Sequence, residues 1–103
     1  MTAHIDFASL PDAEAARLMA EMDGLSPRPY TTSLDAAVGW LGRMGLEWVR
    51  VNDTDGRFFV LVWRESNFQC YGQTVYESPT CPTARALCNA GWSAVQAREA
   101  GEA

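Results

Sequence analysis

The sequence predicts an α+β domain in which a three-stranded antiparallel meander is packed between helices, in the order α-α-β-β-β-α. Apolar residues recur at three- and four-residue steps near both ends of the chain, as in amphipathic helices, whereas the middle changes to a period of two. The run 57–64, Arg-Phe-Phe-Val-Leu-Val-Trp-Arg, places six consecutive apolar residues between two arginines, so a strand there is apolar on both faces. We therefore expect this strand in the middle of the sheet, with helices covering both of its faces.

The first predicted helix covers about 12 residues. Ser9 and Asp12 have the spacing of a capping box, Pro11 suits the first turn, and Gly24 fits the left-handed position at the end. The predicted buried face consists of Ala15, Leu18, Met19 and Met22.

The second predicted helix follows an extended connector, 26–30, in which two prolines disfavour helix. Thr32 or Ser33 caps this helix. Its predicted buried stripe consists of Leu34, Ala37, Val38 and Leu41, with Trp40 and Met44 beside it. Gly39 and Gly42 each cost up to about 1 kcal/mol relative to alanine, so we expect close packing of the helix backbone against the sheet at these positions.

Three strands are predicted next, over 48–51, 58–63 and 68–76, with a bulge at Gly72 in the third. The segment 52–56 ends in Asp-Gly, which is a strong signal for a hairpin turn. A last helix begins near Pro82 and extends to about Arg98. Its predicted buried face consists of Ala84, Leu87, Cys88, Gly91 and Val95, with Trp92 at the edge.

Length and composition indicate one domain over residues 1–103, with flexible arms at 1–8 and 99–103. Hydrophobic residues make up 48% of the chain, which excludes intrinsic disorder. No apolar run reaches the roughly 18 residues of a membrane span. The N-terminal residues show no secretion signal, so we expect a cytoplasmic protein that does not bind membranes.

The charged and sulfur-containing residues exclude several classes of function. The net charge is −5 and all eight basic residues are arginines, so lysine chemistry is absent and dispersed positive charge disfavours nucleic-acid binding. The order of three strands and a helix is shared with double-stranded RNA-binding domains, but Arg85 alone replaces the basic cluster that such domains place on that helix. Cys70, Cys81 and Cys88 have neither disulfide nor zinc spacing and are expected to be free thiols.

Candidate catalytic and metal-binding residues are few. The single histidine, His4, lies in the predicted N-terminal arm, far from any positioned nucleophile. Asp53 and Asp55 offer a weak cation site, but a solvated turn explains them better because other oxygen ligands of a calcium loop are missing. We therefore expect neither an enzyme nor a bound metal or cofactor.

Three segments resemble the phage ABA sandwich domain family. They are 12–22, the segment 30–37 (Tyr-Thr-Thr-Ser-Leu-Asp-Ala-Ala) and the segment 82–90 (Pro-Thr-Ala-Arg-Ala-Leu-Cys-Asn-Ala), with an aromatic-rich meander between the last two. The resemblance extends over roughly residues 10–98 and implies a small phage or prophage protein with a sheet between helical layers. It supplies no catalytic residues.

The phage setting implies a protein that acts by binding a host protein in the bacterial cytoplasm, for example as an inhibitor of a defence system. Aromatic and arginine side chains dominate such interfaces. The residues expected to contact the partner are Arg28, Tyr30, Trp40, Tyr76 and Arg85. Of these, Tyr30 and Tyr76 are expected to be exposed, whereas Trp48 and Trp63 are expected to fill the core.

An alternative is a protein that sequesters a nucleotide or signal molecule in a pocket lined by arginine and aromatic side chains, since arginine binds phosphate and aromatic rings stack on bases. We also expect a homodimer joined through a strand edge or an apolar sheet face, because the outer strands of a short meander leave backbone groups unpaired.

Overall fold

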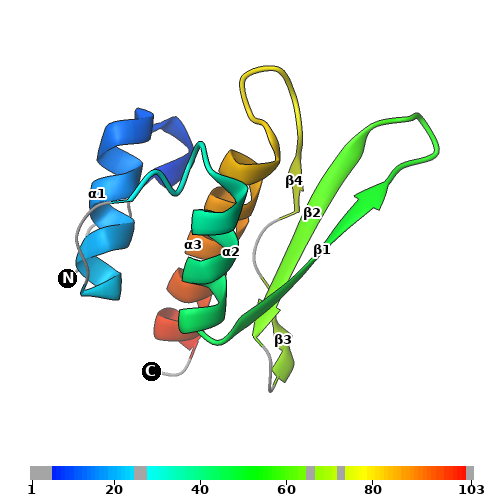
Figure 1. Cartoon of the computed structure of the whole chain (residues 1–103). Helices are drawn as coiled ribbons and strands as arrows, with labels where there is room; N and C mark the ends of the chain where they lie inside the picture. The colour runs from blue at the N-terminus through cyan, green and yellow to red at the C-terminus, as the bar shows by residue number, and fades with distance from the viewer. Residues whose placement is uncertain (1–5, 25–27, 65–66, 72–73, 102–103) are drawn as a thin grey trace.

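The computed structural model describes residues 6–24, 28–64, 67–71 and 74–101. The α+β class and the predicted order of helices and strands are confirmed. In chain order, the elements are the 3₁₀ helix η1 (Phe7–Ser9), helices α1 (Asp12–Asp23) and α2 (Leu34–Arg43), strands β1 (Leu46–Asn52), β2 (Phe58–Arg64), β3 (Asn67–Tyr71) and β4 (Val75–Tyr76), and helix α3 (Thr83–Gly101). Figure 1 shows this order from blue to red.

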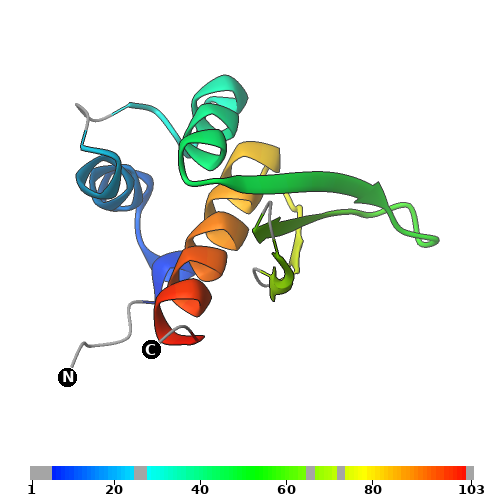
Figure 2. The ribbon, with the colours of Figure 1, turned by 90° about the horizontal axis from the view of Figure 1, so that it is seen from below.

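Helix α3 is the element around which the core is built. It contacts α2 and η1 as well as β2, β3 and β4, and it runs between the other helices and the sheet (Figure 2). The predicted face of α3 is buried, and so are Ala86, Ala90, Trp92 and Ala94. Small residues on several sides of this helix let neighbouring elements approach closely, which places α3 in the interior.

Strand β2 is the centre of the sheet. It pairs antiparallel with β1, with Trp48 opposite Val62 and Val49 opposite Leu61. The other edge of β2 is shared by β3 and β4. The single strand predicted over 68–76 is therefore divided into two segments, and the bulge predicted at Gly72 lies outside the described residues.

The described helices cover one face of the sheet, because all three lie on the same side of it in Figures 1 and 2. Val60 and Val62 point to this side and are fully buried. Phe59 and Leu61 point to the opposite side, are only half-buried and lie outside the core cluster. The expectation that helices cover both faces of β2 is thus corrected: the apolar run did predict the central strand, but one of its faces meets no described helix.

The helix ends follow the predicted chemistry in part. Gly24 ends α1 in the left-handed conformation, with φ of 73°. Ser33 caps α2, and its Oγ accepts a hydrogen bond from the Ala36 amide at 3.4 Å. The capping box predicted at Ser9 is wrong, because Ser9 belongs to η1 and Pro11 occupies the N-cap position of α1 without a side-chain bond.

Two predictions about the packing of α2 are also wrong. Leu34, assigned to the buried stripe, is 46% exposed, whereas Trp40 from the side of that stripe is fully buried. Gly42 has open space where a side chain would lie, and a Cβ at Gly39 would meet only the Arg43 side chain. The close backbone approach is made instead at Gly91 of α3, which packs on α2.

Both of the predicted flexible arms contain described residues that belong to helices. Phe7 is buried and stacks on Trp92, with ring centroids 4.8 Å apart. The arm expected over 1–8 therefore does not include Phe7. At the other end, α3 continues to Gly101, past the point at which the arm over 99–103 was expected to begin.

Candidate functional site

The residues predicted to contact a partner do not form one surface. Tyr30 and Trp40 are fully buried, so the expected exposure of Tyr30 is wrong. The Tyr30 hydroxyl donates to Asp23 Oδ2 at 3.1 Å, and burial raises the pKa of Tyr30. The Trp40 indole N–H donates to the carbonyl oxygen of Met19 at 3.0 Å. Both aromatic residues hold α1, α2 and the connector together.

Arg85 is a core residue as well, with 6% of its surface exposed. Its guanidinium donates to Asp12 Oδ1 at 2.8 Å and to the carbonyl oxygens of Phe7 and Leu10, each at 2.9 Å. It also donates to Asn89 Oδ1 at 3.0 Å on its own helix. Arg85 therefore fixes the N-terminal segment to α3, and its surface is taken up by these contacts.

Tyr76 is 43% exposed, as predicted, and lies on the face of the sheet opposite the helices. Tyr76 of β4 is paired with Phe59 of β2, and directly paired residues lie on the same face of a sheet. On β1, Val51 is paired with Phe59 and Val49 with Leu61, so these residues share that face. We call the resulting surface the outer sheet face; its apolar members are Val49, Val51, Phe59, Leu61, Trp63 and Tyr76. Val49 is 38% exposed and the members on β2 are half-buried, so an apolar surface is accessible here.

Charged side chains lie at both ends of the outer sheet face. At one end, Glu47 Oε2 accepts a hydrogen bond from the Trp63 indole at 3.1 Å. At the hairpin end, the Arg57 guanidinium lies over the Tyr76 ring, 4.5 Å from its centroid. Asp53 and Asp55 lie 3.6 and 3.7 Å from Arg57.

The carboxylate of Asp53 is held in its charged form. The Thr54 hydroxyl donates to it at 3.1 Å and the Tyr76 hydroxyl at 3.3 Å. The hydrogen bond from Thr54, followed by backbone N–H groups and Tyr76, lowers the pKa of Asp53. Among the described side chains at the rim of the outer sheet face, Glu47, Asp53 and Asp55 outnumber the single guanidinium of Arg57, so this part of the rim is acidic.

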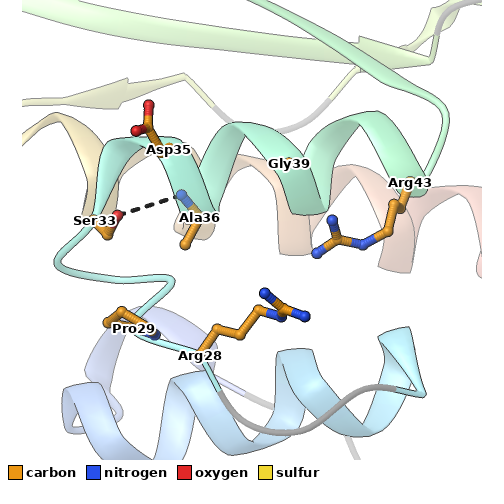
Figure 3. Close-up of a pocket in the computed structure, with 7 residues that line it drawn as sticks. All are labelled: Arg28, Pro29, Ser33, Asp35, Ala36, Gly39 and Arg43. Carbon is orange, nitrogen blue, oxygen red and sulfur yellow. Dashed lines mark hydrogen bonds between the residues drawn. The ribbon is translucent and has the colours of Figure 1, made fainter.

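Arg28 lies at a different place, in a pocket beside α2 (Figure 3). The pocket has a volume of about 360 Å³ and is lined by Arg28, Pro29, Ser33, Asp35, Ala36, Gly39 and Arg43. Figure 3 shows the guanidinium groups of Arg28 and Arg43 directed into the same space between α2 and the connector. None of these described lining residues is aromatic, so they provide only the arginine part of the nucleotide pocket considered from the sequence.

Arg43 is held in place by Asp23 of α1. Its Nε lies 2.8 Å from Oδ1 and its Nη2 lies 2.7 Å from Oδ2. The Asp23 side chain is 2% exposed, whereas that of Arg43 is 41% exposed. The hydrogen bonds from Arg43 hold the pKa of Asp23 below its usual range, with further contributions from Tyr30 and from the charge of Arg28.

Sequence reasoning missed the outer sheet face and the role of Arg43. The six-residue apolar run indicated two apolar faces, but nothing in it indicates which face the helices cover. Arg43 lies in the last turn of α2, where a basic residue is common because it interacts favourably with the helix dipole. Its partner is twenty residues earlier in the chain, at a distance that no local pattern reveals.

Within the described part of the chain, no group of three or more histidine, cysteine, aspartate or glutamate side chains is arranged to hold a metal ion. No helix among these residues is long and apolar enough to cross a lipid bilayer. Comparisons with family models, curated proteins and solved structures found no match to this chain. The phage ABA sandwich resemblance therefore remains a prediction from the sequence.

Proposed function

We propose that this protein binds another protein through the outer sheet face. The supporting observation is the row of accessible apolar and aromatic side chains on β1, β2 and β4, on the side opposite the helices. Val49 and Tyr76 are two of the three large hydrophobic residues that are exposed among the described ones, and both lie on this face. Clustering of this kind is typical of interaction surfaces, whereas scattered exposed residues are not.

The charges around the outer sheet face indicate the kind of partner. Glu47, Asp53 and Asp55 lie at the two ends of the apolar centre, and among the side chains that the structure describes, Arg57 is the cation that contacts Asp53 and Asp55. A partner with an apolar centre and a basic rim would complement this arrangement, which favours both its orientation and its rate of association. The net charge of −5 acts in the same direction over a longer range.

The phage resemblance extends the proposal to a partner in the bacterial host, with components of bacterial immunity as the first class to test. A second copy of the chain is the other occupant considered from the sequence. In that case the acidic rims of the two copies would face each other, which disfavours association because like charges repel.

Two matched substitutions test the proposal. Val49 of the outer sheet face and Leu34 of α2 are both exposed aliphatic residues, 38% and 46% respectively. The immobilised protein and its Val49→Glu and Leu34→Glu variants are exposed to bacterial lysate. Any captured polypeptide is then purified, and its affinity for each form is measured.

We expect Val49→Glu to weaken binding of the purified partner by at least about tenfold, because it places a charge in the desolvated centre of the interface. Leu34→Glu is expected to leave the affinity unchanged. Equal affinity for the parent protein and Val49→Glu would overturn the proposal. Light scattering on the purified protein tests whether the occupant is a second copy of the chain. A dimer that becomes monomeric in Val49→Glu would identify a second copy as the occupant.

A further inference from the structure

We propose that the pocket between α2 and the connector binds the phosphoryl group of a small molecule, in addition to the partner bound at the outer sheet face. The pocket lies on the helical side of the molecule, whereas the outer sheet face is on the opposite side. Its volume of about 360 Å³ is at the lower end of the range for ligand pockets, which is about 300–1,000 Å³. A small phosphorylated compound or inorganic phosphate fits this size.

Local charge favours an anion at this place. The Asp23 carboxylate is paired with Arg43, and Arg28 acts on it only through its charge, although Asp35 also lines the pocket. The backbone carbonyl oxygen of Arg28 accepts a hydrogen bond from the Tyr30 amide at 2.7 Å, but its guanidinium forms no hydrogen bond or ion pair with the described residues. Figure 3 shows the Asp35 carboxylate directed away from the space between the two guanidinium groups, so it does not occupy that space.

The positions of the donors suit a phosphoryl oxygen. Asp23 uses Nε and Nη2 of Arg43, whereas Nη1 donates to none of the described residues. The clamp by Asp23 also fixes the direction of the Arg43 side chain, so little conformational entropy is lost when an anion binds. The guanidinium of Arg28 adds a planar set of donors that matches phosphate oxygens in a bidentate manner.

The floor of the pocket is open because α2 carries small residues there. Ala36 and Gly39 form this part of the helix surface. A Cβ at Gly39 would lie 3.2 Å from Arg43 Nη1, the nitrogen that is available for the anion. Glycine at position 39 therefore keeps both the space and the donor accessible. This also explains why glycine, which is unfavourable inside a helix, occurs at this position of α2.

The test is a titration followed by nuclear magnetic resonance, with the Gly39 amide as the reporter, at constant ionic strength maintained with chloride. Inorganic phosphate and adenosine monophosphate are the two ligands. We expect a saturable shift at Gly39 with at least one of them. Affinity at least about tenfold higher for adenosine monophosphate would assign the site to phosphorylated small molecules, and similar affinities would assign it to free phosphate.

Arg28→Gln is expected to weaken binding by at least about tenfold, because it removes charge-assisted hydrogen bonds. Arg28→Lys keeps the charge but loses the planar donors and is expected to bind with intermediate affinity. The matched control is Arg17→Gln, which removes another exposed positive charge, from α1, where Arg17 pairs with Glu14 and Glu21. A thermal melt establishes that each variant is folded.

Absence of a saturable shift with both ligands would overturn the inference, as would an equal loss of affinity in Arg28→Gln and Arg17→Gln, which would indicate attraction by overall charge only. A negative result in the phosphate titration would not contradict protein binding at the outer sheet face, because Val49 lies on the opposite side of the molecule. Conversely, an unchanged affinity of Val49→Glu for a protein partner has no bearing on the phosphate titration.

Discussion

Gly91 of α3 lies directly against Leu41 of α2, so closely that a Cβ at position 91 would come within 2.6 Å of Leu41 Cδ2. The same atom would lie 3.2 Å from Cζ3 of Trp40. Both α2 side chains are fully buried, so neither can move out into solvent without exposing apolar surface. The crossing of the two helices therefore depends on the absence of a side chain at this position.

Gly91→Ala is expected to destabilise the protein. Overpacking a close contact costs about 1–3 kcal/mol. The higher helix propensity of alanine offsets up to about 1 kcal/mol of this cost. Gly42→Ala is the matched control, since nothing lies within 4 Å of the added Cβ, and it is expected to increase stability. Urea unfolding of the two variants measures the difference; the opposite order of stability would mean that α2 and α3 can separate without cost.

Asp23→Asn is expected to lower the free energy of unfolding at pH 7 by about 1–3 kcal/mol, because it removes charge-assisted hydrogen bonds from a buried carboxylate. Its pKa in the folded protein is below the ordinary value of 3.8. The contribution is therefore fully present above that value and is lost as pH falls through the lower folded pKa. Urea unfolding at pH 7 and at pH 3 should show a smaller difference from the parent protein at pH 3.

Glu21→Gln is the control for Asp23→Asn, because it alters an exposed ion pair with Arg17. It should have almost no effect at either pH, since exposed pairs contribute little. A constant difference between the parent protein and Asp23→Asn across this pH range would contradict the assigned shift in the pKa of Asp23.

Arg85→Met is expected to cost about 2–4 kcal/mol, because two backbone carbonyl groups and Asp12 lose a shared donor. Arg85→Lys should recover only part of this loss, since one ammonium group cannot replace three donor directions. In Arg85→Met, amide hydrogen exchange should increase more in residues 7–12 than in the strands, relative to the parent protein. Faster exchange of the same size throughout the chain would argue against a specific role in fixing the N-terminal segment.

The two described thiols should differ in reactivity. Cys88 is buried, donates to the carbonyl oxygen of Tyr30 at 3.2 Å, and has its pKa raised by burial to about 12. Cys81 is half-buried, and burial raises its pKa as well. Because the thiolate is the reactive form, alkylation at pH 8 should label Cys81 in the folded protein and Cys88 only in urea, as peptide mass spectrometry can determine. Labelling of both at one rate without urea would contradict this burial.

The fold was largely predictable because its signals are local. Turn and cap chemistry at Gly24 and Ser33, helical periodicity, and the change to a period of two in the middle of the chain gave the elements and their order. The face of β2 that the helices cover depends on tertiary packing, which no periodicity encodes when both faces are apolar. For the same reason the sequence predicts close packing at Gly39 and Gly42, whereas the close contact between helices is at Gly91.

The candidate sites were less predictable. Aromatic and arginine residues were chosen by type, but type does not separate a buried Trp40 or Arg85 from an exposed Tyr76, because these side chains combine polar and apolar parts. Arg28 is exposed, yet its neighbour Arg43 becomes relevant only through a contact with Asp23 that joins two helices. Sites formed by residues distant in the chain require the packed structure.

The position of α3 in the chain has a consequence for biosynthesis. Residues 83–101 are translated after the segments against which they pack, so η1, α2, β2, β3 and β4 emerge from the ribosome before the helix that covers them. The hydrophobic core therefore cannot form until α3 has been translated. A version of this protein shortened before residue 83 would not be a smaller folded domain but an exposed sheet and two unsupported helices.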